Sequence, residues 1–239
     1  MAKWSKQLFI RLLCELIASL LVQFLGCSFG QGSSLAYAFS WGGLIIVGTM
    51  AFRIISGAHI NPCISIASMI LKNIKVLDGF LYMLMQLVGS AIGFLIAYVM
   101  FGSNTLFGAN TNYCVTTVTV DPWWKALIIE FYLTGAWVLA FCSSWHESNQ
   151  ELNESVSLKI GLVVVGATLV GAQYSHTCMN PFRSLWPAIF SMNFDHIYIY
   201  VGMPIVAAIL LPFAWLYIYL LGEEETAKGP GAEVKNEEE

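Results

Sequence analysis

Charged side chains are scarce in this sequence. Asp, Glu, Lys and Arg make up 11% of the 239 residues, whereas 57% are hydrophobic. A soluble domain typically carries about 25% charged residues, so the composition argues against a soluble enzyme. Three stretches, 16–52, 79–120 and 197–222, contain none of the four charged residue types. Because a helix needs roughly 20 apolar residues to cross a bilayer, these stretches predict a helical protein that spans the membrane several times.

Clustered cysteines are also missing. The six cysteines are spread along the chain, and the sequence contains no Cys-x-x-Cys pair. Most of them lie in apolar runs, where a free cysteine behaves as a small hydrophobic residue. We therefore expect neither a disulfide framework nor a zinc site.

Polar breaks between the apolar runs divide the chain into six predicted membrane spans. These lie at about 8–29, 35–55, 79–101, 123–142, 158–175 and 197–221. Two further apolar segments, 60–71 and 179–190, are too short to cross a bilayer and suit re-entrant half-helices. The predicted fold is an all-α membrane protein.

Basic residues indicate the orientation of these spans. Eight of them fall on one side of a six-span arrangement: Lys3, Lys6, Arg11, Lys72, Lys75, Lys159, Lys228 and Lys235. Lys125 alone lies near the other side. Cytoplasmic loops of membrane proteins are enriched in Lys and Arg, so we expect both termini in the cytoplasm.

The C-terminal segment is the acidic part of the chain. Residues 223–239 hold seven Glu and two Lys, which predicts a solvated, disordered cytoplasmic tail. The remainder of the chain is close to neutral, and nothing in its charge pattern suggests a nucleic-acid partner.

The two halves of the sequence repeat one pattern. Glu15 is followed 46 residues later by Asn61-Pro62-Cys63, and Glu130 is followed 50 residues later by Asn180-Pro181-Phe182. Each Asn-Pro pair opens one of the two short apolar segments. With three spans in each half, the second half enters the membrane from the opposite side, which predicts an inverted repeat.

An Asn-Pro pair suits the start of a half-helix. Pro in the first turn sacrifices no hydrogen bond, and Asn as the N-cap accepts from the helix with its oxygen and keeps its amide N–H groups for outward donation. Two half-helices that meet head to head place two positive dipole ends at the bilayer centre. That field repels cations and protons, whereas a neutral molecule finds donors for its oxygen. A single Asn-Pro pair is better explained as a turn or cap, but two matching pairs favour a pore.

The two segments resemble the signature loops of the aquaporin (major intrinsic protein) family. The matching residues are 56–62 (Ser-Gly-Ala-His-Ile-Asn-Pro) and 179–188 (Met-Asn-Pro-Phe-Arg-Ser-Leu-Trp-Pro-Ala). The resemblance covers about residues 8–221. It implies a channel domain at 1–222, with repeats at about 8–101 and 123–221, and a homotetramer with a pore through each subunit.

Two signature positions depart from the family's pattern. The family usually has Ala after each Asn-Pro pair, whereas this chain has Cys63 and Phe182. Cys63 adds one sulfur and should be tolerated. A Phe ring in a close-packed contact commonly costs ~1–3 kcal/mol, so Phe182 either reshapes the contact between the half-helices or turns away from the pore.

The resemblance also implies a selectivity filter outside the two Asn residues, at Trp41, Thr168, Thr177 and Arg183. Water-selective members usually have Phe at the first position and His at the second, and glycerol-conducting members have Trp at the first. Thr in place of His should widen the constriction. Ser184 stands where glycerol-conducting members have Asp, which favours water. The alternatives are a lipid-facing Trp41, an interhelical hydrogen bond from Thr168 and an Arg183 in an outer loop.

Other roles follow from the same resemblance. Glu15 and Glu130 are expected to be structural acceptors that brace the two loops. His59 is expected beside the cytoplasmic vestibule. His176 and Cys178 are expected at the outer mouth, where Cys178 would make the pore sensitive to mercury if its thiol faces the lumen.

The sequence therefore predicts a passive channel for water and small neutral solutes such as glycerol and urea. It lies in a lipid bilayer, with the plasma membrane preferred over an intracellular one; no retention or lipidation signal is visible at the C-terminus. The alternative is a non-conducting adhesion or scaffold protein whose pore is plugged by Phe182. We expect no enzymatic activity, catalytic residue, metal or cofactor, because only isolated His and Cys residues occur at membrane depth.

Overall fold

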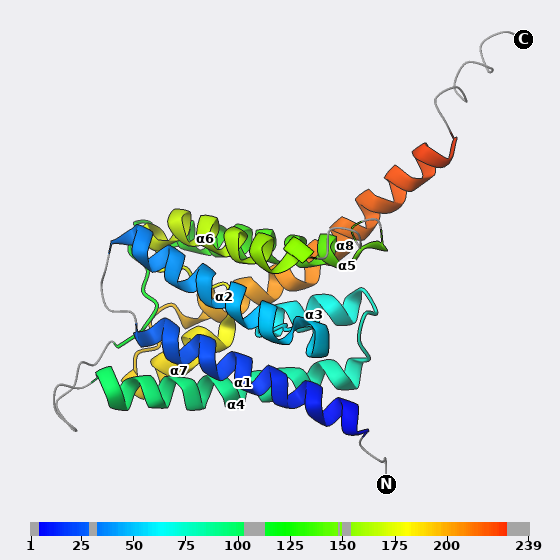
Figure 1. The fold of residues 1–239 in the computed structure, drawn as a ribbon. Helices are drawn as coiled ribbons and strands as arrows, with labels where there is room; N and C mark the ends of the chain where they lie inside the picture. Colours follow the sequence, from blue (N-terminus) through cyan, green and yellow to red (C-terminus); the bar gives the residue numbers. More distant parts are fainter. Residues whose placement is uncertain (1–4, 29–32, 103–112, 148, 150–153, 229–239) are drawn as a thin grey trace, which may run out of the picture.

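The computed structural model describes residues 5–28, 33–102, 113–147, 149 and 154–228. The regular elements of these residues are all helical (Figure 1). They are α1 (Lys6–Ser28), α2 (Ser34–Ser56), α3 (Pro62–Ile70), α4 (Val76–Ala97), the π-helical turn η1 (Tyr98–Gly102), α5 (Trp124–Trp145), α6 (Val156–Ser175), α7 (Pro181–Ser191) and α8 (Ile197–Lys228).

Six of these helices are long and apolar enough to cross a membrane: α1, α2, α4 with η1, α5, α6 and α8. They coincide with the six predicted spans to within a few residues. Their outward faces carry large apolar side chains, including Ile54, which is 92% exposed. A chain with this surface is an integral, multi-pass membrane protein, because lipid is the solvent that such faces prefer.

The two short helices are the predicted half-helices. α3 has nine residues and α7 has eleven, and each begins directly after an Asn N-cap with Pro in its first turn. This confirms six spans with two re-entrant half-helices.

Helix packing follows the inverted repeat. The pair α1 and α4 of the first half corresponds to α5 and α8 of the second, and α1 with α2 corresponds to α5 with α6. α3 contacts α8 just as α7 contacts α4, and α2 packs against α6 between the halves (Figure 1). Each half-helix thus packs against the last span of both halves.

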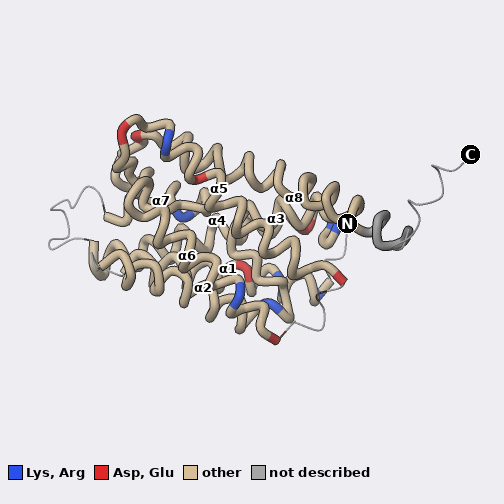
Figure 2. The backbone as a smooth tube through the Cα atoms, turned by 90° about the horizontal axis from the view of Figure 1, so that it is seen from above, with Lys and Arg blue, Asp and Glu red and all other residues tan. Residues whose placement is uncertain are grey.

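The bundle has two distinct ends. α1 begins and α8 ends at the same end, which we call the terminal end; the other end is the distal end (Figure 1). Figure 2 shows few charged residues along the body of the bundle. Arg11 and Asp78 form an ion pair of 3.1 Å near the starts of α1 and α4.

Glycines allow α1 and α4 to touch through their backbones. A Cβ atom added at Gly89 would lie 2.3 Å from the carbonyl oxygen of Leu16, and one added at Gly93 would lie 2.3 Å from that of Leu20. Contact of this kind is typical of helix pairs in membranes. It fixes the position of α1, which supplies part of the site described below.

The expectation of no disulfide is wrong for one pair. Cys27, in the last turn of α1, is bonded to Cys114, 87 residues further along the chain. The two cysteines lie far apart in sequence with no spacing motif, so only the fold brings them together. The other four cysteines, Cys14, Cys63, Cys142 and Cys178, are free and buried.

The predicted tail is partly helical. α8 continues to Lys228, so residues 223–228 extend the sixth span. Residues 229–239 lie outside the described part of the chain, and their disorder stays a prediction.

Candidate functional site

The two Asn-Pro loops are hydrogen-bonded to each other at the centre of the bundle. Asn61 accepts from the Cys63 N–H at 2.9 Å, and its amide donates to the Met179 carbonyl at 2.8 Å. Asn180 accepts from the Phe182 N–H at 3.0 Å, and its amide donates to the Ile60 carbonyl at 3.1 Å. Each side chain therefore caps its own half-helix and ties down the opposite loop, and this uses one of the two N–H groups on each amide.

Glu15 braces the first loop. Its carboxyl oxygens accept from the backbone N–H groups of His59 at 3.0 Å and Ile60 at 2.9 Å. The Ser56 hydroxyl and the Gln86 amide donate to the same carboxyl group at 2.7 and 2.9 Å. Glu15 is 0% exposed, and a buried carboxyl group is tolerated when such donors surround it.

Glu130 does the same for the second loop. It accepts from the backbone N–H groups of Cys178 at 2.8 Å and Met179 at 3.0 Å, and from the Ser175 hydroxyl at 2.6 Å. These donors occupy positions equivalent to those around Glu15, so the repeat extends to single hydrogen bonds.

The braced backbones are strained in matching places. Ala58 and Ile60 have φ of 46° and 58°, and Thr177 and Met179 have φ of 51° and 50°. A left-handed conformation at a residue other than Gly costs about 1–3 kcal/mol and persists only where its surroundings fix it. The hydrogen bonds to Glu15 and Glu130 fix it here, and the carbonyls of Ile60 and Met179 are thereby turned toward the opposite Asn.

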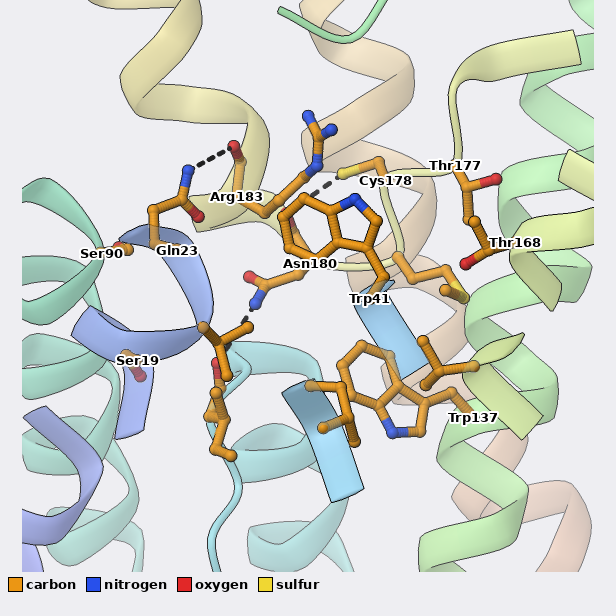
Figure 3. Close-up of a pocket in the computed structure, with 15 residues that line it drawn as sticks. Ser19, Gln23, Trp41, Ser90, Trp137, Thr168, Thr177, Cys178, Asn180 and Arg183 are labelled. Atoms are coloured by element: carbon orange, nitrogen blue, oxygen red, sulfur yellow. Dashed lines mark hydrogen bonds between the residues drawn. The ribbon is translucent and has the colours of Figure 1, made fainter. Parts of the chain in front are cut away.

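A cavity lies beside these loops. Its wall includes all four residues of the predicted filter, Trp41, Thr168, Thr177 and Arg183, together with Asn180 (Figure 3). The other lining residues are Ser19, Val22, Gln23, Ile45, Ile60, Ser90, Trp137, Val164, Cys178 and Met179. Asn61 is 0% exposed and is not part of this wall.

Several contacts hold Arg183 in place. Its Nη1 donates to the Cys114 carbonyl at 3.0 Å and its Nη2 to the Tyr37 hydroxyl at 2.9 Å. Its own carbonyl accepts from the Gln23 amide at 3.2 Å, and its Cζ lies 4.9 Å from the centre of the Trp41 ring. A cation that is 5% exposed at this depth would be costly without such partners.

Trp41 is a side chain of the cavity wall, not of the lipid surface. It is 8% exposed, and a Cβ atom added at Gly26 would lie 2.3 Å from its ring. Gly26 on α1 therefore leaves the room that the indole of α2 fills.

Unpaired polar atoms surround the cavity. Four lining side chains have buried polar atoms without a hydrogen-bond partner among the described residues: Ser19 Oγ, Trp41 Nε1, Trp137 Nε1 and Thr177 Oγ1. Leaving such atoms unpaired is costly, and these four atoms are themselves buried behind the surface of the wall.

Sequence reasoning missed several residues of this site. Gln23 and Tyr37 hold Arg183, and Trp137 of α5 contributes a second indole to the wall. Gln23 is a polar residue within a membrane span, which is a signal that the sequence does carry. Tyr37 and Trp137 carry no such signal, because aromatic residues are common in spans for other reasons.

Phe182 and Cys63 follow the two Asn-Pro pairs without lining the cavity. Phe182 is partly buried, whereas Cys63 is 0% exposed. Both outcomes expected for Phe182 therefore stay predictions.

The three predicted vestibule residues lie in different surroundings. His59 is 2% exposed, with Nδ1 3.1 Å from the Ser65 hydroxyl. Cys178 lines the cavity, but its sulfur lies 3.1 Å from the Asn180 carbonyl and 3.2 Å from the Tyr200 carbonyl. The mercury sensitivity expected for Cys178 stays a prediction.

His176 lies just beyond α6, and its Nδ1 is 2.8 Å from the Thr117 hydroxyl. Burial lowers the pKa of its imidazole, and the positive charge of Arg183 lowers it further. The ring is therefore neutral at neutral pH, and Arg183 supplies the positive charge here. Among the described residues, no cluster of His, Cys, Asp and Glu could hold a metal ion.

Comparisons with known proteins agree with this geometry. A family model described as major intrinsic protein matches residues 3–217. The chain belongs to the major intrinsic protein family. Members of this family, which includes the aquaporins, are channels, so the chain is a membrane channel and not an enzyme.

Individual members are similar over most of their length. Aquaporin-5 of Mus musculus is 33% identical over 231 residues, which cover 91% of this chain and 83% of the relative. The lens fiber major intrinsic protein of Bos taurus is 30% identical over 224 residues, which cover 89% and 82%. Aquaporin-2 of Homo sapiens is 31% identical and covers 85% and 76%.

A solved structure shares the fold. The aquaglyceroporin from Plasmodium falciparum superimposes with a TM-score of 0.71 at 20% sequence identity, covering 88% of this chain and 95% of that one. At this identity the likeness concerns the fold alone.

Proposed function

We propose that this channel conducts water and small neutral polar solutes such as glycerol and urea. The observation that carries the proposal is the cavity wall, where Trp41, Thr168, Thr177 and Arg183 meet beside Asn180. The molecules pass in single file from Arg183 to the two Asn side chains, and no chemical step is involved.

The composition of the wall supports passage of solutes larger than water. Thr168 is a small side chain at the expected constriction, and the Trp41 indole of the same wall offers an apolar surface to a carbon chain. In aquaporin-type channels, selectivity depends on pore diameter, lining hydrogen-bond groups and a fixed positive charge, and Arg183 supplies that charge.

The plugged-scaffold alternative has less support. Phe182 would have to block the pathway, and it is not among the residues that line the cavity. Phe182→Ala tests it directly, because the plug requires permeability to rise in this variant.

The surroundings of the channel are part of the same proposal. We infer a homotetramer in the plasma membrane with both termini in the cytoplasm. The distal end then faces outward, and the Cys27–Cys114 disulfide near the end of α1 fits an oxidising compartment.

Liposomes containing the purified protein test this function. Volume changes would be followed in a stopped-flow instrument after mixing with sucrose and then with glycerol. We expect fast shrinkage in sucrose and fast re-swelling in glycerol. Bare-lipid rates from folded protein would contradict a channel, and fast water flow without glycerol flow would restrict the function to water.

A matched variant isolates the filter. Thr168→His places an imidazole at the narrow point, so glycerol permeability should fall by about tenfold, a factor equal to ~1.4 kcal/mol in the barrier. Water flow should persist. Leu169→His, one residue further along α6 on a side chain that is 38% exposed, is the control and should leave the ratio of the two permeabilities unchanged.

A further inference from the structure

The anchors of Arg183 converge on the last turn of α1. Gln23 of this helix donates to the Arg183 carbonyl at 3.2 Å, and the same amide nitrogen lies 3.3 Å from the sulfur of Cys27. Cys27 is bonded to Cys114, whose carbonyl accepts from Arg183 Nη1 at 3.0 Å. The helix therefore holds the arginine backbone directly and its guanidinium through the disulfide.

Residue 114 has an unfavourable backbone conformation. Its φ is 60°, in the left-handed region that residues other than Gly rarely adopt. Two ties to Cys27 hold this segment, namely the disulfide and a hydrogen bond of 2.6 Å from the Tyr113 hydroxyl to the Cys27 carbonyl. Without the covalent tie, the Tyr113 hydrogen bond is the remaining link to Cys27. Residue 114 then relaxes more readily to a right-handed or extended conformation, which turns its carbonyl away from Arg183.

We propose that the Cys27–Cys114 disulfide is a positioning device of the selectivity filter, which holds the Cys114 carbonyl against Arg183 and thereby sets the discrimination between solutes. The inference rests on the proposed function of this cavity. Cys27 and Cys114 act through Arg183 and touch no solute themselves.

Loss of this anchor has a definite consequence. Arg183 keeps the Tyr37 hydroxyl at Nη2 and the face of Trp41, but Nη1 loses its acceptor. A guanidinium with fewer fixed partners samples more positions, so the narrow point discriminates less sharply by size. Larger solutes gain most, and glycerol permeability rises relative to that of water.

Three variants of the full chain in liposomes test the proposal: Cys27→Ser, Cys114→Ser and the double variant. Serine at 27 preserves an acceptor for Gln23, and each substitution leaves the backbone carbonyl of residue 114 in place. Since all three break the same bond, they should raise the glycerol-to-water ratio equally, by about two- to tenfold, the range expected for one hydrogen bond. The ratio does not depend on how many channels are active.

Chemical reduction should reproduce the effect in the unmodified chain. A membrane-impermeant phosphine, tris(2-carboxyethyl)phosphine, cleaves the disulfide to two thiols and is itself oxidised to the phosphine oxide with oxygen from water. The ratio should rise in the wild-type channel and stay constant in the double variant. Cys14→Ser, a free buried thiol on the same helix, is the control and should match the wild type before and after reduction.

A second readout is independent of conduction. Phenylglyoxal labelling of Arg183, measured by peptide mass spectrometry relative to Arg11, should become faster after reduction and in the three variants. If the oxidised channel conducts nothing, the proposed function fails, but the labelling still tests the inference about the disulfide. An unchanged rate of Arg183 labelling then overturns that inference. In a conducting channel, an unchanged glycerol-to-water ratio overturns the inference, even if fewer channels are active. The disulfide would then stabilise the fold without positioning the filter.

Discussion

Trp137 shows how much one side chain can decide at this site. Its indole stands in the cavity wall in addition to that of Trp41, it is 3% exposed, and its Nε1 has no partner among the described residues. A bulky ring narrows the passage, whereas its N–H offers a donor. Size and hydrogen bonding thus act in opposite directions on a passing solute.

Shortening this side chain separates the two effects. Trp137→Leu should raise glycerol permeability relative to water by at least about twofold, because pore diameter decides which solutes pass. Stopped-flow measurements on liposomes check this. Trp124→Leu on the same helix, where the ring is 48% exposed, is the matched control. A fall in the ratio would mean that the indole N–H outweighs the bulk of the ring.

At the scale of elements, α3 and α7 depend on the carboxyl groups behind them. Each half-helix begins at a strained loop, and each loop is held by N–H donors to Glu15 or Glu130. The hydrogen bonds to Glu15 and those to Glu130 are equivalent in the repeat. Loss of either set should therefore loosen the same central contact between the two Asn-Pro loops.

Isosteric amide substitutions test these two sets of hydrogen bonds. Glu130→Gln and Glu15→Gln replace one accepting oxygen with an NH2 group that faces existing donors, which should cost about 1–3 kcal/mol for the bond left unmade. Both variants should unfold at lower temperature than the wild type when tryptophan fluorescence is followed in detergent. Glu154→Gln, at an exposed position, should not. Equal melting temperatures for all four proteins would show that the loops keep their conformation without the full set of hydrogen bonds to Glu15 and Glu130.

At the scale of the whole molecule, the proposed orientation rests on charge and is consistent with the disulfide. Basic residues gather at the terminal end, whereas Cys27 lies at the distal end of α1. In intact cells, epitope tags at either terminus should bind antibody only after permeabilisation. A tag inserted at residue 108, in the segment between α4 and α5, should bind without it. Surface staining of the terminal tags would reverse the orientation, and with it the side from which a reductant reaches the disulfide.

The sequence by itself determined the architecture. Scarce charge, six apolar runs and two Asn-Pro pairs in matching places predicted six spans with two half-helices, because a membrane allows few structures besides helices whose backbone bonds are satisfied internally. The paired acids Glu15 and Glu130 were visible for the same reason, since a carboxyl group at that depth needs an explanation.

Only the tertiary structure decided the details of the site. Nothing in the spacing of Cys27 and Cys114 indicates a bond across 87 residues, and nothing in the sequence places Trp137 in the wall or Phe182 outside it. These features depend on how helices rotate and cross, which is set by contacts such as Gly26 against Trp41. Periodicity fixes which residues share a helix, whereas packing fixes which of them face the solute.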